Sequence, residues 1–149
     1  MTAHTLLLVE DNAQDEKLAM RALGKIDLAI AVDVVRDGQE ALDYLFREGN
    51  FARLRGTGLP VAVLLDIGLP KLSGLEVLAR LRAHPSTRLL PIVMLTSSDD
   101  EGDRLRSYRD GANSFVRKPV EFDRYTDTLI QLGRYWWQMN EPPPEMANA

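Results

Sequence analysis

Four apolar segments of this chain are each followed directly by polar side chains that could work together as one chemical site. Glu10 and Asp11 follow the first segment, Asp66 the second, Thr96 the third and Lys118 the fourth. Each residue has an ordinary explanation by itself, because an aspartate with glycine and proline shortly after it, as Asp66 has, commonly begins a turn. As a set they supply carboxylates for a hard cation, and a hydroxyl and an ammonium group for an anion.

Hydrophobic periodicity predicts the strands that would position these residues. Four short apolar runs are typical of buried strands; they span residues 5–9, 61–65, 91–95 and 114–116. A fifth run, 29–35, alternates, with Ile30, Val32 and Val34 on one face and Asp33 on the other. Such alternation is typical of an edge strand with one wetter face.

Helical segments alternate with these strands. A helix capped by Asp11 or Asn12 follows the first strand; the others begin after "RDG", begin at Ser73, span Asp99–Asp110, and run from Glu121 to about Met139. The segment Asp99–Asp110 offers only Leu105 and Tyr108 to a core, and residues 48–60 are expected to form a loop. Five strands alternating with five helices predict an α/β domain with a parallel sheet, because parallel neighbours need crossover connections.

The amino-acid composition excludes several kinds of functional site. The chain has 149 residues, enough for one well-buried core, and no cysteine, so disulfides and thiolate sites are excluded. Its two histidines, His4 and His84, lie far apart beside expected element ends, so a histidine-dependent catalytic triad is not expected. The net charge of -4 argues against general nucleic-acid binding. No membrane segment or signal peptide is recognisable, so we expect a cytoplasmic protein.

The predicted fold brings the polar residues together. In doubly wound sheets, ligands bind at the carboxyl ends of the strands, where the acids, the hydroxyl and the ammonium group all fall. Three converging carboxylates repel one another unless a cation lies among them, and an all-oxygen ligand set favours Mg²⁺. Asp66 then becomes a candidate nucleophile for a phosphoryl group, with Lys118 and Thr96 contacting the oxygens of that group. A carboxylate needs no general base, which fits the absence of a suitable histidine.

These residues lie in motifs that resemble the receiver domain of two-component response regulators. The segments "LLLVEDN", "LLDIGLPKLSG", "PIVMLTSS" and "GANSFVRKP" match that family in order and spacing, over about residues 5–137. The resemblance implies the flavodoxin-like (βα)5 fold, with a five-stranded parallel sheet of order 2-1-3-4-5 and helices on both faces. An edge position for the alternating second strand agrees with that order.

The resemblance also implies roles for individual residues. Asp66 would accept a phosphoryl group from the phosphohistidine of a sensor histidine kinase, with Mg²⁺ bound by carboxylates and the carbonyl oxygen of Gly68. Phe115 would be the aromatic residue whose rotamer follows Thr96. The segments "RDGQEALDYLFREG" and "LGRYWWQ" are most similar to small stand-alone regulators that serve bacterial phytochrome kinases, so a bacteriophytochrome is an expected partner.

Two positions depart from the family pattern. Gly68 stands where many receivers carry a larger residue, so no side chain there screens a phosphoryl group on Asp66 from water. Ser73 stands where aspartate is common, and it still suits a helix cap. We therefore expect Gly68 to affect the lifetime of the phosphorylated state, and we expect no functional loss from Ser73.

Output is expected through contact with an unidentified downstream protein. Residues 1–138 would form the receiver domain and residues 139–149 a flexible proline-rich tail, with no separate output domain and no direct contact with nucleic acid or membrane. The last helix carries apolar residues on more than one face, which predicts a homodimer through the fourth helix, fifth strand and fifth helix. The expected interface residues are Phe122, Tyr125, Ile130 and Trp137.

Two other functions remain open from the sequence alone. A Mg²⁺-dependent phosphohydrolase could use the same carboxylates, although it would want a second acid near the nucleophile, where Ile67 and Gly68 follow Asp66. A phosphate-independent scaffold could keep the fold without the chemistry, although the complete residue set argues against it. We do not expect an enzyme that acts on external substrates. We expect at most self-phosphorylation from small donors and slow autodephosphorylation.

Overall fold

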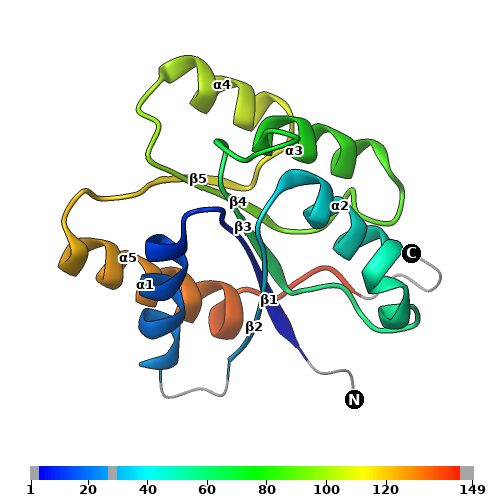
Figure 1. Ribbon diagram of the computed structural model, residues 1–149, viewed down its shortest axis with the longest axis horizontal. Coiled ribbons are helices and arrows are strands. Elements are labelled where there is room, and N and C mark those ends of the chain that lie inside the picture. Colours follow the sequence, from blue (N-terminus) through cyan, green and yellow to red (C-terminus); the bar gives the residue numbers. More distant parts are fainter. Residues whose placement is uncertain (1–3, 27–29, 145–149) are drawn as a thin grey trace.

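The computed structural model describes residues 4–26 and 30–144, which contain a single five-stranded parallel sheet (Figure 1). The strand order is β2-β1-β3-β4-β5, as the family resemblance implied. The strands are β1 (Thr5–Val9), β2 (Ala31–Val35), β3 (Ala62–Leu65), β4 (Ile92–Thr96) and β5 (Ser114–Arg117). Four of them lie within one residue of their predicted bounds. Strands β1, β3 and β4 are buried, as continuous apolar runs predict, whereas β5 is an edge strand whose residues are only partly buried or exposed.

Strand β2 is the edge strand that its alternating pattern predicts. It begins at Ala31, so Ile30 precedes it, and residue 29 lies outside the described residues. Val32 and Val34 pack on one face of the sheet, whereas the exposed Asp33 accepts a hydrogen bond of 2.5 Å from the hydroxyl of Tyr44 on the other side. This hydrogen bond therefore links β2 to α2, the helix that follows it.

Helices cover both faces of the sheet. Their bounds are α1 (Ala13–Gly24), α2 (Gly38–Phe46), α3 (Gly74–Ala83), α4 (Glu101–Arg109) and α5 (Phe122–Arg134). Side chains of α1 and α5 form one apolar cluster with the sheet, and side chains of α2 and α3 form a second cluster on the opposite face, with α4 beside α3 (Figure 1). No helix among the described residues is long and apolar enough to cross a membrane.

Helix α1 packs closely against α5 because of one glycine. Ala19, Ala22 and Leu23 on α1 are buried, as their helical spacing predicts. A Cβ atom on Gly133 of α5 would lie 2.6 Å from Leu23 and 2.7 Å from Ile26. A side chain at position 133 would have to displace the ends of the Leu23 and Ile26 side chains, so glycine favours close packing of the C-terminal ends of α1 and α5.

Helix α4 corrects one prediction. Leu105 and Tyr108, the two residues expected in the core, are 57% and 51% exposed, whereas Ser107 is fully buried and donates a hydrogen bond to the carbonyl oxygen of Asp103. The sequence pattern was misleading because α4 is held by small and polar contacts. Arg82 of α3 donates a hydrogen bond to the carbonyl oxygen of Gly111, shortly after α4. Burial lowers the pKa of Arg82.

Two further segments differ from expectation. The 48–60 loop contains a 3-10 helix, η1 (Gly49–Leu54), whose residue Phe51 packs edge-on against Tyr44. The last helix does not continue as an α-helix to Met139, because α5 ends at Arg134 and a π-helical turn, η2 (Tyr135–Met139), follows it. That turn places Trp136 in the apolar cluster beneath α1 and α5.

Candidate functional site

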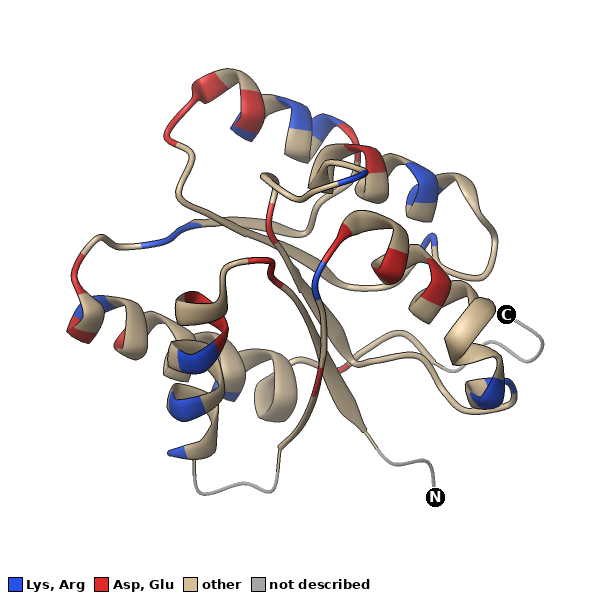
Figure 2. Ribbon diagram, in the orientation of Figure 1, with Lys and Arg blue, Asp and Glu red and all other residues tan. Residues whose placement is uncertain are grey.

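Strand register brings the predicted site residues to one edge of the sheet. Val9 pairs with Leu65 in the parallel ladder, and the backbone N–H of Asp66 donates to the carbonyl oxygen of Val9 at 3.3 Å. The N–H of Lys118 likewise donates to the carbonyl oxygen of Thr96 at 2.7 Å. Figure 2 shows the acidic ends of β1 and β3 on the same side of the sheet as the basic end of β5.

Lys118 lies at the centre of this edge. Its Nζ donates to Oε1 of Glu10, to Oδ2 of Asp15 at 3.1 Å and to Oδ2 of Asp66 at 3.1 Å. The Lys118 side chain is 7% exposed, and those of Glu10, Asp66 and Asp15 are 1%, 12% and 30% exposed. One ammonium group therefore neutralises part of a three-carboxylate cluster in a poorly solvated place.

Burial acts on both partners of the Lys118–Glu10 pair. Burial raises the pKa of Glu10 above its ordinary value, although the Lys118 ammonium partly opposes this. Burial by itself would lower the pKa of Lys118. The nearby carboxylates of Glu10 and Asp66 have the larger effect, so the pKa of Lys118 is raised. Lys118 therefore stays a cation, available to an anionic group at this edge.

Three carboxylates converge closely enough to offer ligands to one divalent cation. One oxygen from each of Glu10, Asp11 and Asp66 lies within 4.8 Å of the other two. The set contains oxygen donors only, which suits a hard cation such as Mg²⁺ or Mn²⁺. These residues suit a divalent cation for a second reason, because a bound cation would compensate the negative charge of the buried Glu10.

The Asp66 carboxylate is held at both oxygens. The backbone N–H of Gly68 donates to Oδ1 at 3.2 Å, and Lys118 contacts Oδ2. Its backbone is held too, because a Cβ atom on Gly74 would lie 2.0 Å from the carbonyl oxygen of Asp66. The start of α3 therefore packs directly on the loop that carries Asp66, with Ser73 as the N-cap that accepts from the N–H of Glu76.

Thr96 and Phe115 lie on neighbouring strands. Thr96 ends β4 and is buried, with its Oγ1 accepting a hydrogen bond from the N–H of Ser98 at 3.3 Å. Phe115 on β5 pairs with Met94 on β4 and packs, partly buried, against the cluster of α2 and α3. Because Thr96 follows Met94 by two residues on β4, the structure places Thr96 and Phe115 on the same face of the sheet.

The four residues predicted for a dimer interface do not share one environment. Phe122 is 66% exposed at the start of α5, while Ile130 and Trp137 are partly buried against the core. Tyr125 is 3% exposed and belongs to the core of the monomer, so its side chain is not available at the surface. The apolar stripe of α5 marked Tyr125 correctly as hydrophobic, but its spacing does not say which face the sheet covers.

Asp15 is the site residue that sequence reasoning missed. It lies in the first turn of α1, where an acid has an ordinary role because the helix dipole stabilises it. Its position, four residues after Asp11 in a helix that starts at the sheet edge, was a usable signal. What the sequence does not contain is the approach of α1 to Lys118, 103 residues away in the chain.

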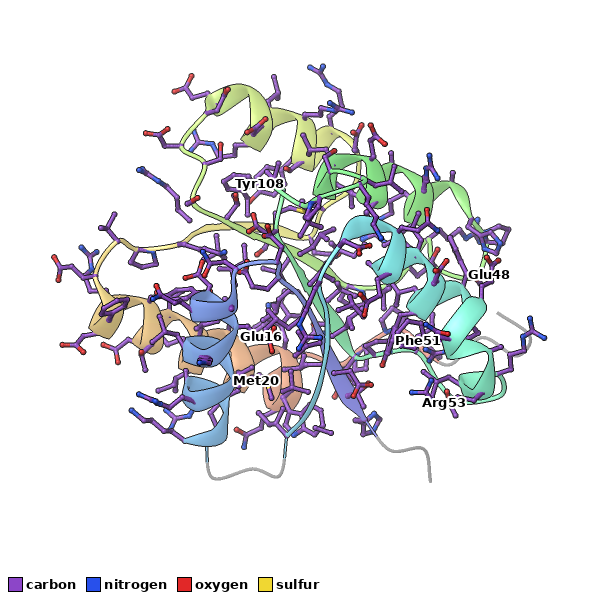
Figure 3. All side chains as sticks on the ribbon, in the orientation of Figure 1. Glu16, Met20, Glu48, Phe51, Arg53 and Tyr108 are labelled. Carbon is purple, nitrogen blue, oxygen red and sulfur yellow. The ribbon has the colours of Figure 1, made fainter. Side chains whose placement is uncertain are left out.

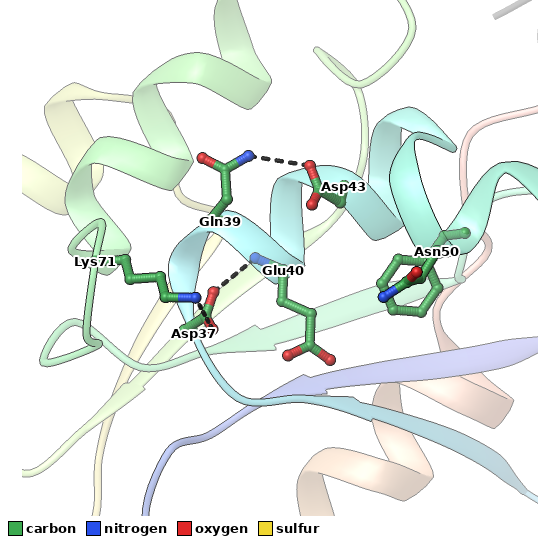
Figure 4. A pocket seen from close by; sticks show the side chains of 7 residues that line it. Asp37, Gln39, Glu40, Asp43, Asn50 and Lys71 are labelled. Carbon is green, nitrogen blue, oxygen red and sulfur yellow. Dashed lines mark hydrogen bonds and ion pairs between the residues drawn. The ribbon is translucent and has the colours of Figure 1, made fainter.

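Other polar features lie apart from this site. An open hollow of about 300 Å³ beside α2 is lined by Asp37, Gln39, Glu40, Asp43, Asn50, Phe51 and Lys71 (Figure 4), none of which was predicted for the site. Lys71 forms an ion pair with Asp37 there at 3.3 Å. His4 and His84 are both exposed, as expected.

Comparisons with known proteins agree with this geometry. The sequence profile described as "Response regulator receiver domain" matches residues 6–130. Response regulator Rcp1 of Synechocystis is 34% identical over 131 residues, covering 88% of this chain and 87% of Rcp1. A crystal structure of Rcp1 in its Mn²⁺-bound form has a TM-score of 0.88 at 28% identity, covering 95% of this chain and 99% of that one.

Two further structures come from phytochrome systems. The phosphorylated cyanobacterial phytochrome response regulator RcpA has a TM-score of 0.87 at 34% identity, over 95% of this chain and 99% of that one. The bacteriophytochrome response regulator RtBRR has a TM-score of 0.74 at 49% identity, over 97% of this chain and 86% of that one. By its sequence, its strand order and its cluster of carboxylates around a lysine, this chain belongs to the response regulator receiver domain family.

Proposed function

We propose that this protein accepts a phosphoryl group on Asp66 from the phosphohistidine of a sensor kinase and signals by contact with another protein. The observation that carries the proposal is the pairing of Asp66 Oδ2 with Lys118 Nζ at 3.1 Å, beside the carboxylates of Glu10 and Asp11. A nucleophile and a cation for the transferred group are then adjacent at one sheet edge.

The transfer step follows from the residues around Asp66. A carboxylate oxygen of Asp66 attacks phosphorus, an O–P bond forms, and the P–N bond of the donor breaks with its electron pair leaving on the imidazole. The Gly68 N–H and Lys118 orient the two oxygens of Asp66 before attack. The Lys118 ammonium and the Thr96 hydroxyl would then contact the phosphoryl oxygens in the product.

Glu10, Asp11 and Asp66, with the Gly68 carbonyl oxygen, would hold Mg²⁺ in this proposal. A bound Mg²⁺ supplies positive charge that neutralises part of the charge on the transferring group. The protein residues would set the cation in place by offering oxygen donors only, one of them on the buried Glu10.

Phosphorylation of a matched pair of variants tests the acceptor. Wild type, Asp66→Asn and the control Asp99→Asn, which changes an exposed carboxylate paired with Arg117, are incubated with acetyl phosphate and Mg²⁺. Intact mass should show one added phosphoryl group on wild type and Asp99→Asn and none on Asp66→Asn. Label that survives in Asp66→Asn would refute the proposal, as would absence of label on folded wild type, which would favour a scaffold.

The same reaction separates a signalling protein from a phosphohydrolase. We propose slow self-phosphorylation from small donors and slow autodephosphorylation; in support, the hollow beside α2 is lined by none of the site residues. Release of inorganic phosphate from a small phosphoester should therefore proceed at the rate of the Asp66→Asn protein. Rapid Asp66-dependent turnover would favour the hydrolase instead.

We propose a bacteriophytochrome histidine kinase as the donor. Its support is the similarity to RtBRR and RcpA, whose names place them in phytochrome signalling. A purified autophosphorylated bacteriophytochrome kinase should label Asp66 within seconds to minutes, and an unrelated histidine kinase should not. Equal transfer from both kinases would remove the subfamily assignment while leaving Asp66 as acceptor.

Phosphorylation would be read out through Thr96 and Phe115. The added charge draws the Thr96 hydroxyl towards the phosphoryl group, and the ring of Phe115 turns into the space that Thr96 leaves. Beryllofluoride with Mg²⁺ should shift the amide resonances of both residues and of α4, which packs with polar contacts. Unchanged resonances there would overturn this switch.

A homodimer through α4, β5 and α5 is also proposed. The exposed apolar side chains that support it are Leu105 and Tyr108 on α4 and Val120 and Phe122 at the start of α5. Since Tyr125 is buried, Phe122 would carry most of the α5 contribution. Sedimentation equilibrium should show a dimer that Phe122→Ser weakens; a monomer at tens of micromolar with and without beryllofluoride would refute it.

A further inference from the structure

We propose that Asp15 is a positioning residue that competes with the phosphoryl group for Lys118, and so limits how readily Asp66 is phosphorylated. The inference rests on the proposed function of Asp66 and adds a residue to the control of that site. It starts from the contacts of Lys118 in the unphosphorylated protein.

The hydrogen-bonding capacity of Lys118 is already used up. A lysine ammonium has three N–H donors and no acceptor. In this structure Nζ contacts one oxygen each of Glu10, Asp15 and Asp66. A phosphoryl oxygen can therefore gain a full hydrogen bond from Lys118 only if one of these carboxylates gives up its own.

Asp66 loses its carboxylate charge when the phosphoryl group is attached, and of the two partners of Lys118 that stay charged, Asp15 is released at the lower cost. Its side chain is 30% exposed, so water can solvate it, whereas Glu10 is almost fully buried. Glu10 and Asp66 also belong to the group of carboxylates that could hold a cation, and Asp15 does not. Asp15 lies in the first turn of α1, where the helix dipole still favours its charge without Lys118.

In the unphosphorylated protein, the competition for Lys118 favours Asp15 over an arriving phosphoryl group. While Asp15 holds Lys118, the arriving phosphoryl group must displace a charge-assisted hydrogen bond before it receives one. Removal of the Asp15 charge should make Lys118 available from the start. The same exchange frees a carboxylate at the start of α1, so the first turn of α1 would respond to phosphorylation.

Glu16 provides a matched control for this idea. It is the next residue in the same turn of α1, carries the same charge and pairs with Arg36 at 2.9 Å instead of Lys118 (Figure 3 shows Glu16 on α1). Asp15→Asn and Glu16→Gln each remove one negative charge close to the site. A general electrostatic effect should therefore appear in both variants, and a specific effect on Lys118 only in Asp15→Asn.

The experiment measures beryllofluoride affinity and the phosphorylation rate with acetyl phosphate, both at saturating Mg²⁺, in folded full-length protein. Asp15→Asn should bind beryllofluoride roughly threefold to tenfold more tightly than wild type and be phosphorylated faster by a similar factor. Glu16→Gln should remain within about twofold of wild type. Equal behaviour of wild type, Asp15→Asn and Glu16→Gln would overturn the inference, and so would an equal gain in both variants.

A second measurement distinguishes positioning from a structural effect. The side-chain carboxyl ¹³C resonance of Asp15 in wild type should move towards that of a solvated carboxylate when beryllofluoride binds, and that of Glu16 should not. An unchanged Asp15 resonance with the analogue bound would also overturn the inference. Failure of wild type to be phosphorylated on Asp66 would instead refute the proposed function, so the two failures are distinguishable.

Discussion

The carbonyl oxygen of Asp66 lies where a side chain on Gly74 would have to be, with only 2.0 Å between it and an ideal Cβ position. Glycine at position 74 therefore lets the start of α3 rest directly on the loop that carries Asp66. This contact links the stability of the domain to the placement of the Asp66 carboxylate.

Gly74→Ala should destabilise the protein and impair phosphorylation together. The added methyl group meets backbone atoms that cannot rotate away, so we expect a loss of about 1–3 kcal/mol in the free energy of unfolding. Urea denaturation measures this loss. Gly24→Ala at the end of α1 is the control, since its Cβ would meet nothing within 4 Å. A Gly74→Ala protein as stable as Gly24→Ala would contradict the packing described.

Divalent cations should stabilise the folded protein through Asp11. Mg²⁺ bound only by the folded state adds about 2.7 kcal/mol at a concentration one hundred times its dissociation constant. The melting temperature should therefore rise with Mg²⁺ in wild type. Asp11→Asn should lose most of that rise, because Asp11 is one of the three converging carboxylates. Asp99→Asn, at an exposed aspartate, should keep the rise; its loss there would indicate non-specific binding.

Two buried tyrosines should respond oppositely to loss of the hydroxyl. The hydroxyl of Tyr125 is buried and has no hydrogen-bond partner among the described residues, whereas that of Tyr44 donates to Asp33. Tyr125→Phe should raise the free energy of unfolding, and Tyr44→Phe should lower it, each by about 1 kcal/mol. Chemical denaturation at neutral pH measures both. Destabilisation by Tyr125→Phe would mean that its hydroxyl is satisfied in solution.

Tyr44 should also make stability fall at alkaline pH. Burial, then the hydrogen bond to Asp33, raises its pKa from 10.0 to about 12. Between these values the unfolded chain has lost the proton and the folded protein keeps it, so the contribution of Tyr44 is complete below pH 10 and is lost as pH rises towards 12. The difference in unfolding free energy between wild type and Tyr44→Phe should shrink over this range; a constant difference would contradict the shifted pKa.

Gly68 should limit the lifetime of the phosphorylated state. A Cβ atom there would meet nothing within 4 Å, so a larger side chain fits without disturbing the fold. Gly68→Met should screen the phosphoryl group from water and lengthen its half-life by roughly threefold or more. Phos-tag electrophoresis after removal of the donor measures the half-life, with urea denaturation to show unchanged stability. An unchanged half-life would assign the lifetime to other residues.

The sequence by itself determined the alternation of strands and helices along the chain and the type of residue at each strand end. Continuous apolar runs such as 61–65 must be buried on both faces, and this requirement predicts a parallel sheet with Asp66 at its carboxyl edge. Those runs, together with the spacing of the family motifs, were enough to bring Glu10, Asp66 and Lys118 into one predicted site, where the structure also places them.

Only the tertiary structure decided which side chains face that site and which face the core. Asp15 reaches Lys118 because the fold brings the first turn of α1 beside the end of β5, a contact between residues 103 positions apart in the chain. Tyr125 is buried, and the two apolar residues of α4 are exposed, because helical period marks a stripe without showing what covers it. The residues of the site follow from local pattern, whereas the partners of Lys118 follow from packing, which no single segment of sequence contains.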